Sequence, residues 1–404
     1  YNTAATEFNT TRKNQNNHKV INIMIRRAIS IDKMCPYGLL YFGVESATEY
    51  KNSRSVLMRL FAAQVHSFNF ITVRYIVYKS KLDLQETELA IKALKDHFES
   101  TLAAKLNLTR VSAPLFVLPQ TGLNDNLNGT ERPVAFDIKE TGCTAEIVHS
   151  LAKWKRYALK RYGFSAGEGL YTDMNAIRRD EICDELHSIY VDQYDWEKII
   201  TPRERNREYL RYTVREIYEV IHNAQHYLEK LFPVLKTDFL PREITFVSTQ
   251  ELEDEYPLLT PRERERTAAE KYGAIFLENI GGKLKSGKVH DGRAPDYDDW
   301  SLNGDIILFY PVLQTAFEVS SMGIRVDSEA MQRQLMQAGL PERACLPYHR
   351  GVISGELPLT IGGGIGQSRL CMYFLQKRHI GEVQASIWPE DTMRKCSLEG
   401  ITLL

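Results

Sequence analysis

The chain has 404 residues, a formal net charge of −1 at pH 7 and 25% charged residues, which is the composition of an ordinary globular protein. This length accommodates one large domain with an appendage, or two domains. The balanced charge gives no global attraction to nucleic acid or to a membrane surface, and no apolar run approaches the roughly 20 residues that span a bilayer. The six cysteines are scattered without a C-x-x-C pair, so neither a zinc site nor a disulfide framework is indicated, and a reducing, cytosolic setting fits best.

Residues 1–82 carry 12 lysine and arginine residues against 4 aspartate and glutamate residues, so this part is a basic leader. Its first twenty residues are rich in asparagine and threonine, which is typical of a chain without fixed structure. A basic, acid-poor leader is compatible with an organelle-targeting segment, but a poorly ordered extension is the interpretation that we prefer. We therefore expect two parts, the extension at 1–82 and a catalytic domain at 84–404, in a cytoplasmic protein unless the leader is a targeting signal.

From about residue 84 the periodicity of the apolar residues becomes regular. A helix is predicted through residues 86–106, followed by a short strand that ends at Pro114. A long amphipathic helix is predicted at 206–232 and ends before Pro233. Strands are predicted at 134–138, 145–150, 243–248, 305–311 and 314–326. Because helices and strands mix without a βαβ rhythm, the prediction is an α+β fold with a largely antiparallel sheet flanked by helices.

The most informative stretch is the glycine-rich segment 362–366, followed by Arg369, where the pattern turns apolar and helical. Glycines let a backbone pass close to a ligand, and the planar fork of an arginine suits phosphate. The segment is not a Walker loop, because no Gly-Lys-Ser/Thr closes it, and it lacks the context of a dinucleotide fingerprint. Taken alone, a tight strand-to-helix turn explains it equally well.

Residues 171–195 predict a charged hairpin. Arg178 leaves the first strand, a polar loop follows, and the second strand returns with acidic residues on it. In isolation a solvated hairpin is the default interpretation. Together with Arg369, however, Arg178 supplies the two separate arginines that suit a nucleoside triphosphate, one at the phosphorus under attack and one at the departing phosphates.

Two acids, Asp305 and Glu318, stand at the borders of apolar strands. Carboxylates in such places are costly unless they bind a cation or an arginine. Hard oxygen ligands combined with phosphates are the usual way in which magnesium is held. The alternative is that both acids pair with Arg325 or another base.

Three further segments allow more than one interpretation. The basic stretch 149–156 is either a solvated face or a place where a lysine points toward a carboxylate substrate. The acids of 291–299 lack the spacing of an EF-hand calcium loop. Asp125, in a run of asparagine, aspartate and glycine residues, reads as a turn residue.

Taken together, these segments resemble one family. The matching runs are VHSLAKWKR (148–156), FSAGEGLYTDM (164–174), YVDQYDWE (190–197), RAPDYDDW (293–300), LNGDI (302–306), SSMGIRVD (320–327) and IGGGIGQSRL (361–370). In this order they closely resemble the ammonia-dependent asparagine synthetase, over roughly residues 84–404. That family is similar to the catalytic core of class II aminoacyl-tRNA synthetases, particularly the aspartyl enzyme.

The resemblance implies a largely antiparallel sheet flanked by helices and a homodimer, with the helix 86–106 at the dimer interface. It makes Arg178 the arginine of the second class motif and Arg369 that of the third. The loop after Trp300 is short for the family, which puts only the role of that loop in doubt. The implied reaction joins L-aspartate, ATP and ammonia through a β-aspartyl adenylate and gives L-asparagine, AMP and pyrophosphate.

The resemblance also implies roles at the ATP end of the site. Arg178 would stabilise the α-phosphoryl group, and Arg369 would hold the γ-phosphate. Gly364 would belong to the ATP site. Asp305 and Glu318 would carry Mg²⁺ that bridges the phosphates.

At the aspartate end, Lys155 and Arg325 would clamp the α-carboxylate of the substrate, with Ser321 beside them, and Lys155 would also count among the catalytic residues. The α-ammonium group would be received by Asp125, Gln193 and Asp195. Asp296 would steer or deprotonate the incoming ammonium.

Three other functions fit the sequence less well. An aminoacyl-tRNA synthetase needs an anticodon-reading domain, and residues 1–82 are too short and irregular to be identified as one. A non-catalytic paralogue would typically lose the phosphate arginines or the metal acids, which are present here. A glutamine-dependent amidotransferase would need an N-terminal cysteine nucleophile, and none is evident. The predicted partners are therefore small molecules and a second copy of the chain, without nucleic acid or membrane.

Overall fold

The computed structural model describes residues 78–125, 127 and 131–404, and the chain divides by its contacts into two units, Tyr1–Tyr75 and Ile76–Leu404. The predictions made for the basic leader lie almost wholly outside the described residues. The last residues of the leader pack against the folded body: Leu82 is buried, and the Tyr78 amide donates to the Glu399 carbonyl oxygen at 3.1 Å. The folded body therefore begins a few residues before position 84.

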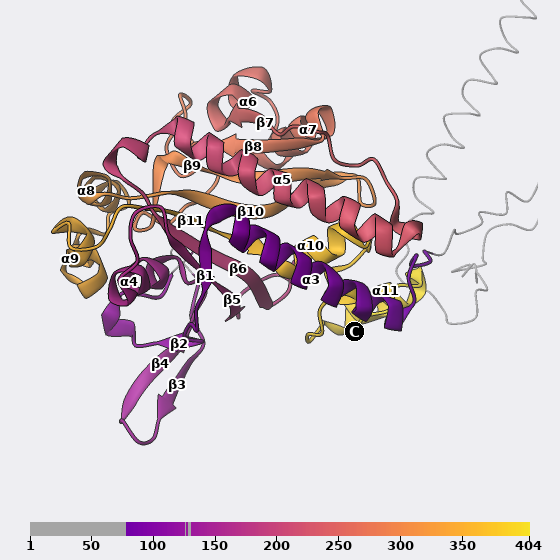
Figure 1. Cartoon of the computed structure of the whole chain (residues 1–404), viewed down its shortest axis with the longest axis horizontal. Coiled ribbons are helices and arrows are strands. Elements are labelled where there is room, and N and C mark those ends of the chain that lie inside the picture. The colour runs from indigo at the N-terminus through magenta and orange to yellow at the C-terminus, as the bar shows by residue number, and fades with distance from the viewer. Residues whose placement is uncertain (1–77, 126, 128–130) are drawn as a thin grey trace, which may run out of the picture. The chain divides into compact units, whose positions relative to one another are not determined.

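An eight-stranded sheet runs through the body in the order β1-β5-β6-β11-β10-β9-β8-β7 (Figure 1). Its strands are β1 (Leu108–Arg110), β5 (Gly169–Ile177), β6 (Tyr190–Ile199), β7 (Thr245–Ser248), β8 (Ala274–Glu278), β9 (Asp298–Tyr310), β10 (Thr315–Arg325) and β11 (Thr360–Gly366). The pairings in the middle are antiparallel, whereas β1 pairs with β5 and β7 pairs with β8 in parallel. The sheet is therefore mixed, and the prediction of a largely antiparallel sheet is wrong in this respect.

The parallel pairs occur where the chain returns by a long connection instead of a hairpin. Between β7 and β8 it passes through α6 (Thr249–Glu255) and α7 (Pro261–Tyr272). Between β1 and β5 it passes through a small second sheet and α4 (Ala152–Tyr162). A parallel pair requires such a crossover, because the chain must travel back to the starting end of its neighbour. The sequence-based prediction missed β8, which is a fully buried run of only five residues.

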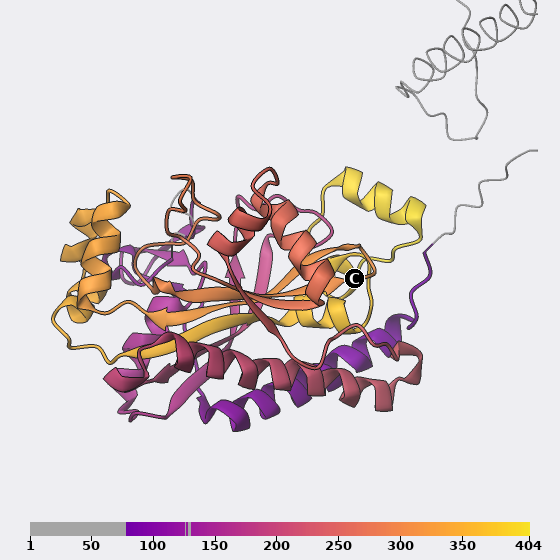
Figure 2. The same ribbon diagram turned by 90° about the horizontal axis from the view of Figure 1, so that it is seen from above.

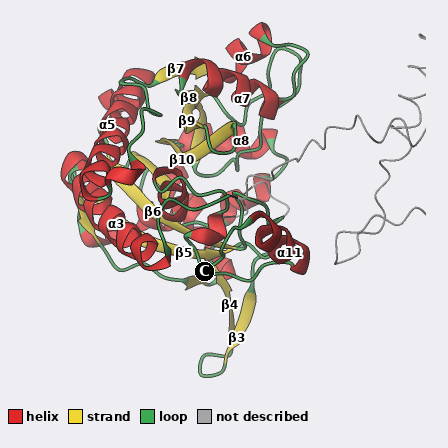
Figure 3. Cartoon of the chain, turned by 90° about the vertical axis from the view of Figure 1, so that its right-hand side faces the viewer, coloured by secondary structure: helices red, strands yellow, loops and turns green. Residues whose placement is uncertain are grey.

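Two long helices cover one face of the sheet. These are α3 (Leu84–Leu106) and α5 (Arg207–Leu231), which lie side by side, while α7 and α11 (Glu390–Glu399) lie on the opposite face (Figures 2 and 3). Both predicted long helices are confirmed. A capping box made by Asp83 and Glu86 starts α3, and Asn107 ends it with a left-handed backbone. The apolar stripe of α5 is buried, so the main core lies between these helices and the sheet.

The other elements surround this core. Helices α8 (Ser328–Gln337) and α9 (Pro347–Ile353) precede β11 in the sequence, and α10 (Gln367–Phe374) follows it directly. The small sheet has the order β2-β4-β3, with bounds Phe116–Val117, Cys143–Ile147 and Ala135–Ile138, and it projects from the body (Figure 1). Within the described residues, no helix is long and apolar enough to cross a membrane, and the five cysteines are free.

The glycine-rich segment forms strand β11, which pairs with β6 on one side and with β10 on the other. A methyl group at Gly362 would lie 2.1 Å from Oε2 of Glu197, and one at Gly364 would lie 2.5 Å from Oε1 of Gln193. Polar side chains of β6 thus occupy the space that side chains of β11 would need. The backbone at Gly362 therefore lies close to the buried carboxylate of Glu197, which is a group of the protein itself.

We expect Gly362→Ala to lower the free energy of unfolding by about 1–3 kcal/mol, because the added methyl group forces β11 or Glu197 to move in a packed layer. Urea unfolding followed by circular dichroism measures this loss. Gly282→Ala is the matched control, since nothing lies within 4 Å of a methyl group at that position. Equal stability of the two variants would contradict the steric explanation.

Candidate active site

A cavity of about 350 Å³ lies where the β5–β6 hairpin meets β9, β10, β11 and the start of α10. The cavity is lined by residues from several of the predicted motifs, namely Arg178, Gln193, Asp305, Glu318, Gly364 and Arg369. These residues are distant in the sequence, but the strand order β5-β6-β11-β10-β9 makes the strands that carry them neighbours. The predicted ATP-binding residues therefore share one cavity.

Two of the predicted arginines face this cavity. The backbone amide of Arg178 donates to the Ile189 carbonyl oxygen at 2.8 Å and closes the hairpin, while its side-chain Nε is buried without a hydrogen-bond partner among the described residues. Arg369, in the first turn of α10, donates from Nη1 to the Glu318 carbonyl oxygen at 2.8 Å. A buried donor without a partner is costly, so the guanidinium of Arg178 is suited to an anionic ligand.

The two predicted metal acids, Asp305 and Glu318, lie on the adjacent strands β9 and β10. Burial raises the pKa of Asp305 to about 7; Arg293 opposes this shift and the Glu318 carboxylate adds to it. The side chain of Glu318 is 46% exposed, and Arg369 with the other arginines of the cavity holds the pKa of Glu318 below its usual value. A carboxylate such as Asp305, whose ionisation is disfavoured by burial and by a neighbouring carboxylate, suits a place where a cation or a positive side chain completes the charge balance.

Arg293 is a cavity residue to which the sequence analysis gave no role. Its Nη2 donates to Oδ1 of Asp305 at 2.6 Å, and its Nη1 donates to Oγ of Ser321. Its Nε is buried and has no hydrogen-bond partner among the residues that the structure describes. Arg293 opens the run RAPDYDDW, so its position was visible in the sequence, but only the fold brings it to Asp305.

The basic stretch of α4 is buried, which rules out its interpretation as a solvated face. Lys153, Lys155 and Arg156 are each at most 2% exposed. Lys155 donates to the carboxylate of Asp195 and, at 3.0 Å, to the carbonyl oxygen of Gly363. Lys155 therefore lies beneath the glycine-rich strand and already has an acidic partner in the protein.

Arg325 belongs to the same buried layer. Its Nε and Nη2 donate to the carboxylate of Glu197 at 2.8–3.1 Å, and its Nη1 donates to Asp298. Although burial acts in the opposite direction, these two acids raise the pKa of Arg325 above its usual range. The two residues predicted to clamp the α-carboxylate, Lys155 and Arg325, are thus paired within the protein and are not among the residues that line the cavity.

Sequence comparisons decide the family. A family model described as aspartate-ammonia ligase matches residues 85–400. The curated aspartate–ammonia ligase of Ruminiclostridium cellulolyticum is 63% identical over 328 residues, which cover 81% of this chain and 97% of that protein. The chain belongs to the aspartate–ammonia ligase family. The curated ligase of Fusobacterium nucleatum is 60% identical over 81% of this chain and 100% of that protein. The predicted ammonia-dependent synthesis of asparagine is thereby confirmed.

Solved structures similar to this ligase agree with the predicted fold. The asparaginyl-tRNA synthetase of Pyrococcus horikoshii complexed with asparaginyl-adenylate has a TM-score of 0.56 and 15% identity, and the match covers 75% of this chain and 70% of that chain. The asparaginyl-tRNA synthetase of Entamoeba histolytica has a TM-score of 0.54 and 14% identity, with 74% and 67% covered. At such identities the likeness concerns the fold alone, which is that of class II aminoacyl-tRNA synthetases.

Three further residues predicted for aspartate, Asp125, Asp195 and Ser321, are not part of the cavity wall of the ligase. Asp125 is buried and accepts hydrogen bonds from Ser150 Oγ at 2.8 Å and from the Leu127 amide at 2.9 Å. Ser321 accepts from Arg293. Of the six residues predicted to bind aspartate, Gln193 alone is part of the wall.

Asp296, predicted to handle ammonium, is completely buried among basic side chains. Its Oδ2 accepts from Lys153 at 3.0 Å, lies 3.0 Å from His349 Nε2, and accepts from Arg343 at 3.3 Å. Burial acts against ionisation, but Lys153 and His349 outweigh it and hold the pKa of Asp296 well below its usual range. Asp296 therefore ties α4 to α9 and to the segment before it, and it does not line the cavity.

We expect Asp296→Asn to lower the free energy of unfolding at neutral pH by about 3 kcal/mol, because it leaves buried basic groups without their carboxylate. Since the pKa of Asp296 is lower in the folded state than its ordinary value of 3.8, its contribution is present above that value and is lost as the pH falls. The variant should lack this acid-dependent component. Urea titrations between pH 3 and pH 7 measure it, with the exposed Asp391→Asn as the control.

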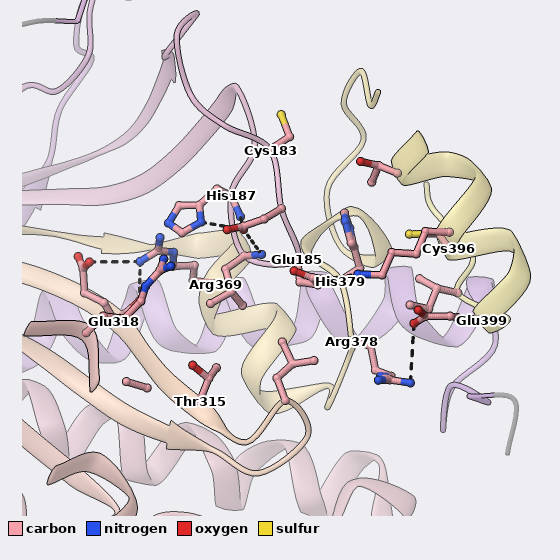
Figure 4. A pocket seen from close by; sticks show the side chains of 18 of the residues that line it. Cys183, Glu185, His187, Thr315, Glu318, Arg369, Arg378, His379, Cys396 and Glu399 are labelled. Atoms are coloured by element: carbon pink, nitrogen blue, oxygen red, sulfur yellow. Dashed lines mark hydrogen bonds and ion pairs between the residues drawn. The ribbon is translucent and has the colours of Figure 1, made fainter. Parts of the chain in front are cut away.

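A second cavity, of about 700 Å³, adjoins the first one (Figure 4). The two cavities share the wall residues Leu186, His187, Glu318 and Arg369. In Figure 4 Arg369 and Glu318 point toward one another at one end of this cavity, and Glu399 of α11 lies at the other end. Arg369 therefore stands at the junction of the two cavities.

Proposed function

We propose that the β-carboxylate of L-aspartate attacks the α-phosphorus of ATP and displaces pyrophosphate, which gives a β-aspartyl adenylate. Ammonia then attacks the activated carbonyl carbon and displaces AMP to give L-asparagine. A free carboxylate does not react with ammonia at neutral pH, because its oxygen is a poor leaving group, and adenylation supplies a good one. The observation that carries the proposal is that Arg178, Arg293 and Arg369 meet Asp305 and Glu318 in the wall of one cavity.

At the phosphate end, Arg178 stabilises the α-phosphoryl group in both steps, because its unpaired Nε is available to the charge that develops there. Arg369 binds the γ-phosphate from the junction of the two cavities. Gly364 belongs to the ATP site in this scheme, and a nucleotide that approaches the backbone there must displace the Gln193 side chain, which lies against it. Arg293 adds a third guanidinium group, which holds Asp305 in place.

Asp305 and Glu318 are the residues that would hold Mg²⁺. Both offer hard oxygen donors, and within the described residues no group of three or more potential metal ligands exists that could hold an ion without help. This donor set fits magnesium, which commonly takes one or two carboxylates from the protein and its other ligands from phosphates and water. When bound, the ion supplies charge neutralisation to the phosphates of ATP.

At the aspartate end, Lys155 and Arg325, with Ser321, attract the α-carboxylate, while Asp125, Gln193 and Asp195 receive the α-ammonium group. Gln193 does so from the cavity wall. The others must act through the wall or exchange an internal ion pair for the substrate, which requires side-chain rearrangement on binding.

Asp296 steers or deprotonates ammonium in this scheme, and its burial among basic groups makes it the residue whose role is supported least. A pH profile of kcat that is unchanged in Asp296→Asn would remove this role and leave the rest of the scheme intact.

We further propose that the ligase is a homodimer that buries the outer face of α3. Exposed leucines on that helix, Leu84 and Leu89, support this placement. Light scattering coupled to size-exclusion chromatography should give about twice the chain mass of 46.5 kDa.

The decisive assay measures pyrophosphate release from ATP and L-aspartate with and without ammonium, together with chromatography for asparagine and AMP. Asparagine that forms only with ammonium, and without any need of tRNA, supports the proposal. Pyrophosphate exchange without free asparagine would mean that the activated aspartyl group goes to another acceptor.

A further inference from the structure

Asp192 is a cavity residue that has no part in the reaction scheme above. It lies on β6, is 7% exposed and is part of the wall of the 350 Å³ cavity. Its Oδ1 accepts from the backbone amide of Ser368 at 3.0 Å, and its Oδ2 accepts from the hydroxyl of Ser368 at 2.8 Å. Both hydrogen bonds join the strand to the first turn of α10.

Helix α10 has no cap of its own. Its N-cap residue is Gly366, which has no side chain to offer, so the amides of the first turn need acceptors from elsewhere. Asp192 supplies one, and its negative charge lies at the positive end of the helix dipole. Gln384 also binds Ser368, because its Nε2 donates to Ser368 Oγ at 3.1 Å. Side chains from outside the helix therefore fix where α10 begins.

Arg369 directly follows Ser368, so the start of α10 determines where its guanidinium group lies. In the observed position Nη1 of Arg369 donates to the Glu318 carbonyl oxygen at 2.8 Å, and it lies 3.5 Å from the Glu318 carboxylate. Functional groups must be held within about 0.5 Å of their productive geometry. A loosened first turn would therefore impair Arg369 before it disturbed the rest of the fold.

Asp192 is also connected to α3. Lys95 Nζ donates to Asp192 Oδ2 at 3.1 Å, and the Tyr194 hydroxyl donates to the Lys95 carbonyl oxygen at 3.1 Å. The side chain of Lys95 is 30% exposed, whereas that of Asp192 is only 8% exposed. Lys95 thus supplies the positive charge that a nearly buried carboxylate needs.

We propose that Asp192 is a positioning residue for Arg369: through Ser368 it fixes the start of α10, and Lys95 of α3 neutralises its charge. This inference rests on the proposed role of Arg369 at the γ-phosphate. Its consequence is selective, because ATP contacts Arg369 through its terminal phosphate and AMP has no such group. Loss of the Asp192 contacts should therefore weaken ATP and spare AMP.

The test compares Asp192→Asn, Ser368→Ala and the double variant by calorimetric binding of ATP and of AMP, and by KM for ATP and for aspartate. A hydrogen bond to a charged group corresponds to a factor of about 10 or more in affinity. We expect each single variant to weaken ATP binding about tenfold, while AMP binding and KM for aspartate stay within about twofold. The double variant should lose little more than Asp192→Asn, because both changes break the same contact.

Lys95→Met tests the countercharge and should weaken ATP binding in the same selective way. Lys285→Met is its matched control, since Lys285 is 72% exposed, pairs with Asp254 at 2.7 Å and is not among the residues that line either cavity. If Asp192→Asn does not fold, the comparison of ATP binding with AMP binding is made with Ser368→Ala and Lys95→Met alone. Equal losses of ATP and AMP binding, or additive losses in the double variant, would overturn the inference.

Arg369→Gln separates this inference from the proposed function. If Arg369→Gln itself binds ATP normally, the γ-phosphate role of Arg369 fails, and the inference fails with it. If Arg369→Gln loses ATP selectively but Asp192→Asn does not, only the positioning role of Asp192 is wrong.

Discussion

Replacing Arg178 by glutamine is expected to lower kcat for asparagine formation by about 10²–10³-fold, which is the usual effect of removing one donor that stabilises charge in a transition state. Arg178 is suited to this role because its Nε is buried in the cavity region without a partner among the described residues. Neutral glutamine keeps a donor but supplies neither the charge nor the fork of the guanidinium group. Pyrophosphate release at saturating ATP and aspartate measures the loss.

Arg110→Gln is the matched control for Arg178→Gln, because Arg110 is an exposed arginine at the edge of the same sheet and pairs with Asp173 at 3.2 Å. Its kcat should stay within about twofold of the parent, as expected for a surface ion pair. Arg178→Lys should recover part of the activity, since it keeps the charge without the two-pronged geometry. A kcat for Arg178→Gln within tenfold of the parent would rule out a direct role at the α-phosphoryl group.

Replacing Arg325 by methionine is expected to lower the free energy of unfolding by about 3–5 kcal/mol, because it leaves buried acids without their partner. Arg325 makes hydrogen bonds to Glu197 and Asp298, which are 0% and 1% exposed. Methionine fills much of the same volume, so the loss reports the charge and not an empty space. Urea unfolding at pH 7 measures it, and activity should fall in parallel because the layer supports β11.

Arg333→Met is the control for Arg325→Met. Arg333 is 45% exposed, and its ion pairs are long, at 3.7 and 3.9 Å, so about 0–1 kcal/mol is expected. Adding Glu197→Gln to Arg325→Met should restore part of the lost stability, because it removes one of the unpaired charges. A loss below about 1 kcal/mol in Arg325→Met would mean that water or another group compensates the acids.

Features with a strong local pattern were determined by the sequence itself. Apolar residues at helical spacing located α3 and α5, and two strand-like segments joined by the polar loop after Arg178 located the β5–β6 hairpin. Long, unusual runs such as RAPDYDDW and IGGGIGQSRL were sufficient to indicate the family. These features are local because each depends on residues within one or two turns, or on a contiguous motif.

Features that depend on partners far away in the chain were decided only by the tertiary structure. The parallel pairs at the edges of the sheet result from crossover connections. Glycines are required in β11 because Glu197 and Gln193 of the neighbouring strand fill the space beside them. The proposed role of Asp192 depends on its contacts with Ser368 and Lys95. The sequence likewise marked Lys155 and Arg325 as functional but could not show that both are paired inside the protein. A periodic pattern predicts which face of a helix or strand is buried. The charged groups that lie against that face depend on which strands become neighbours in the sheet.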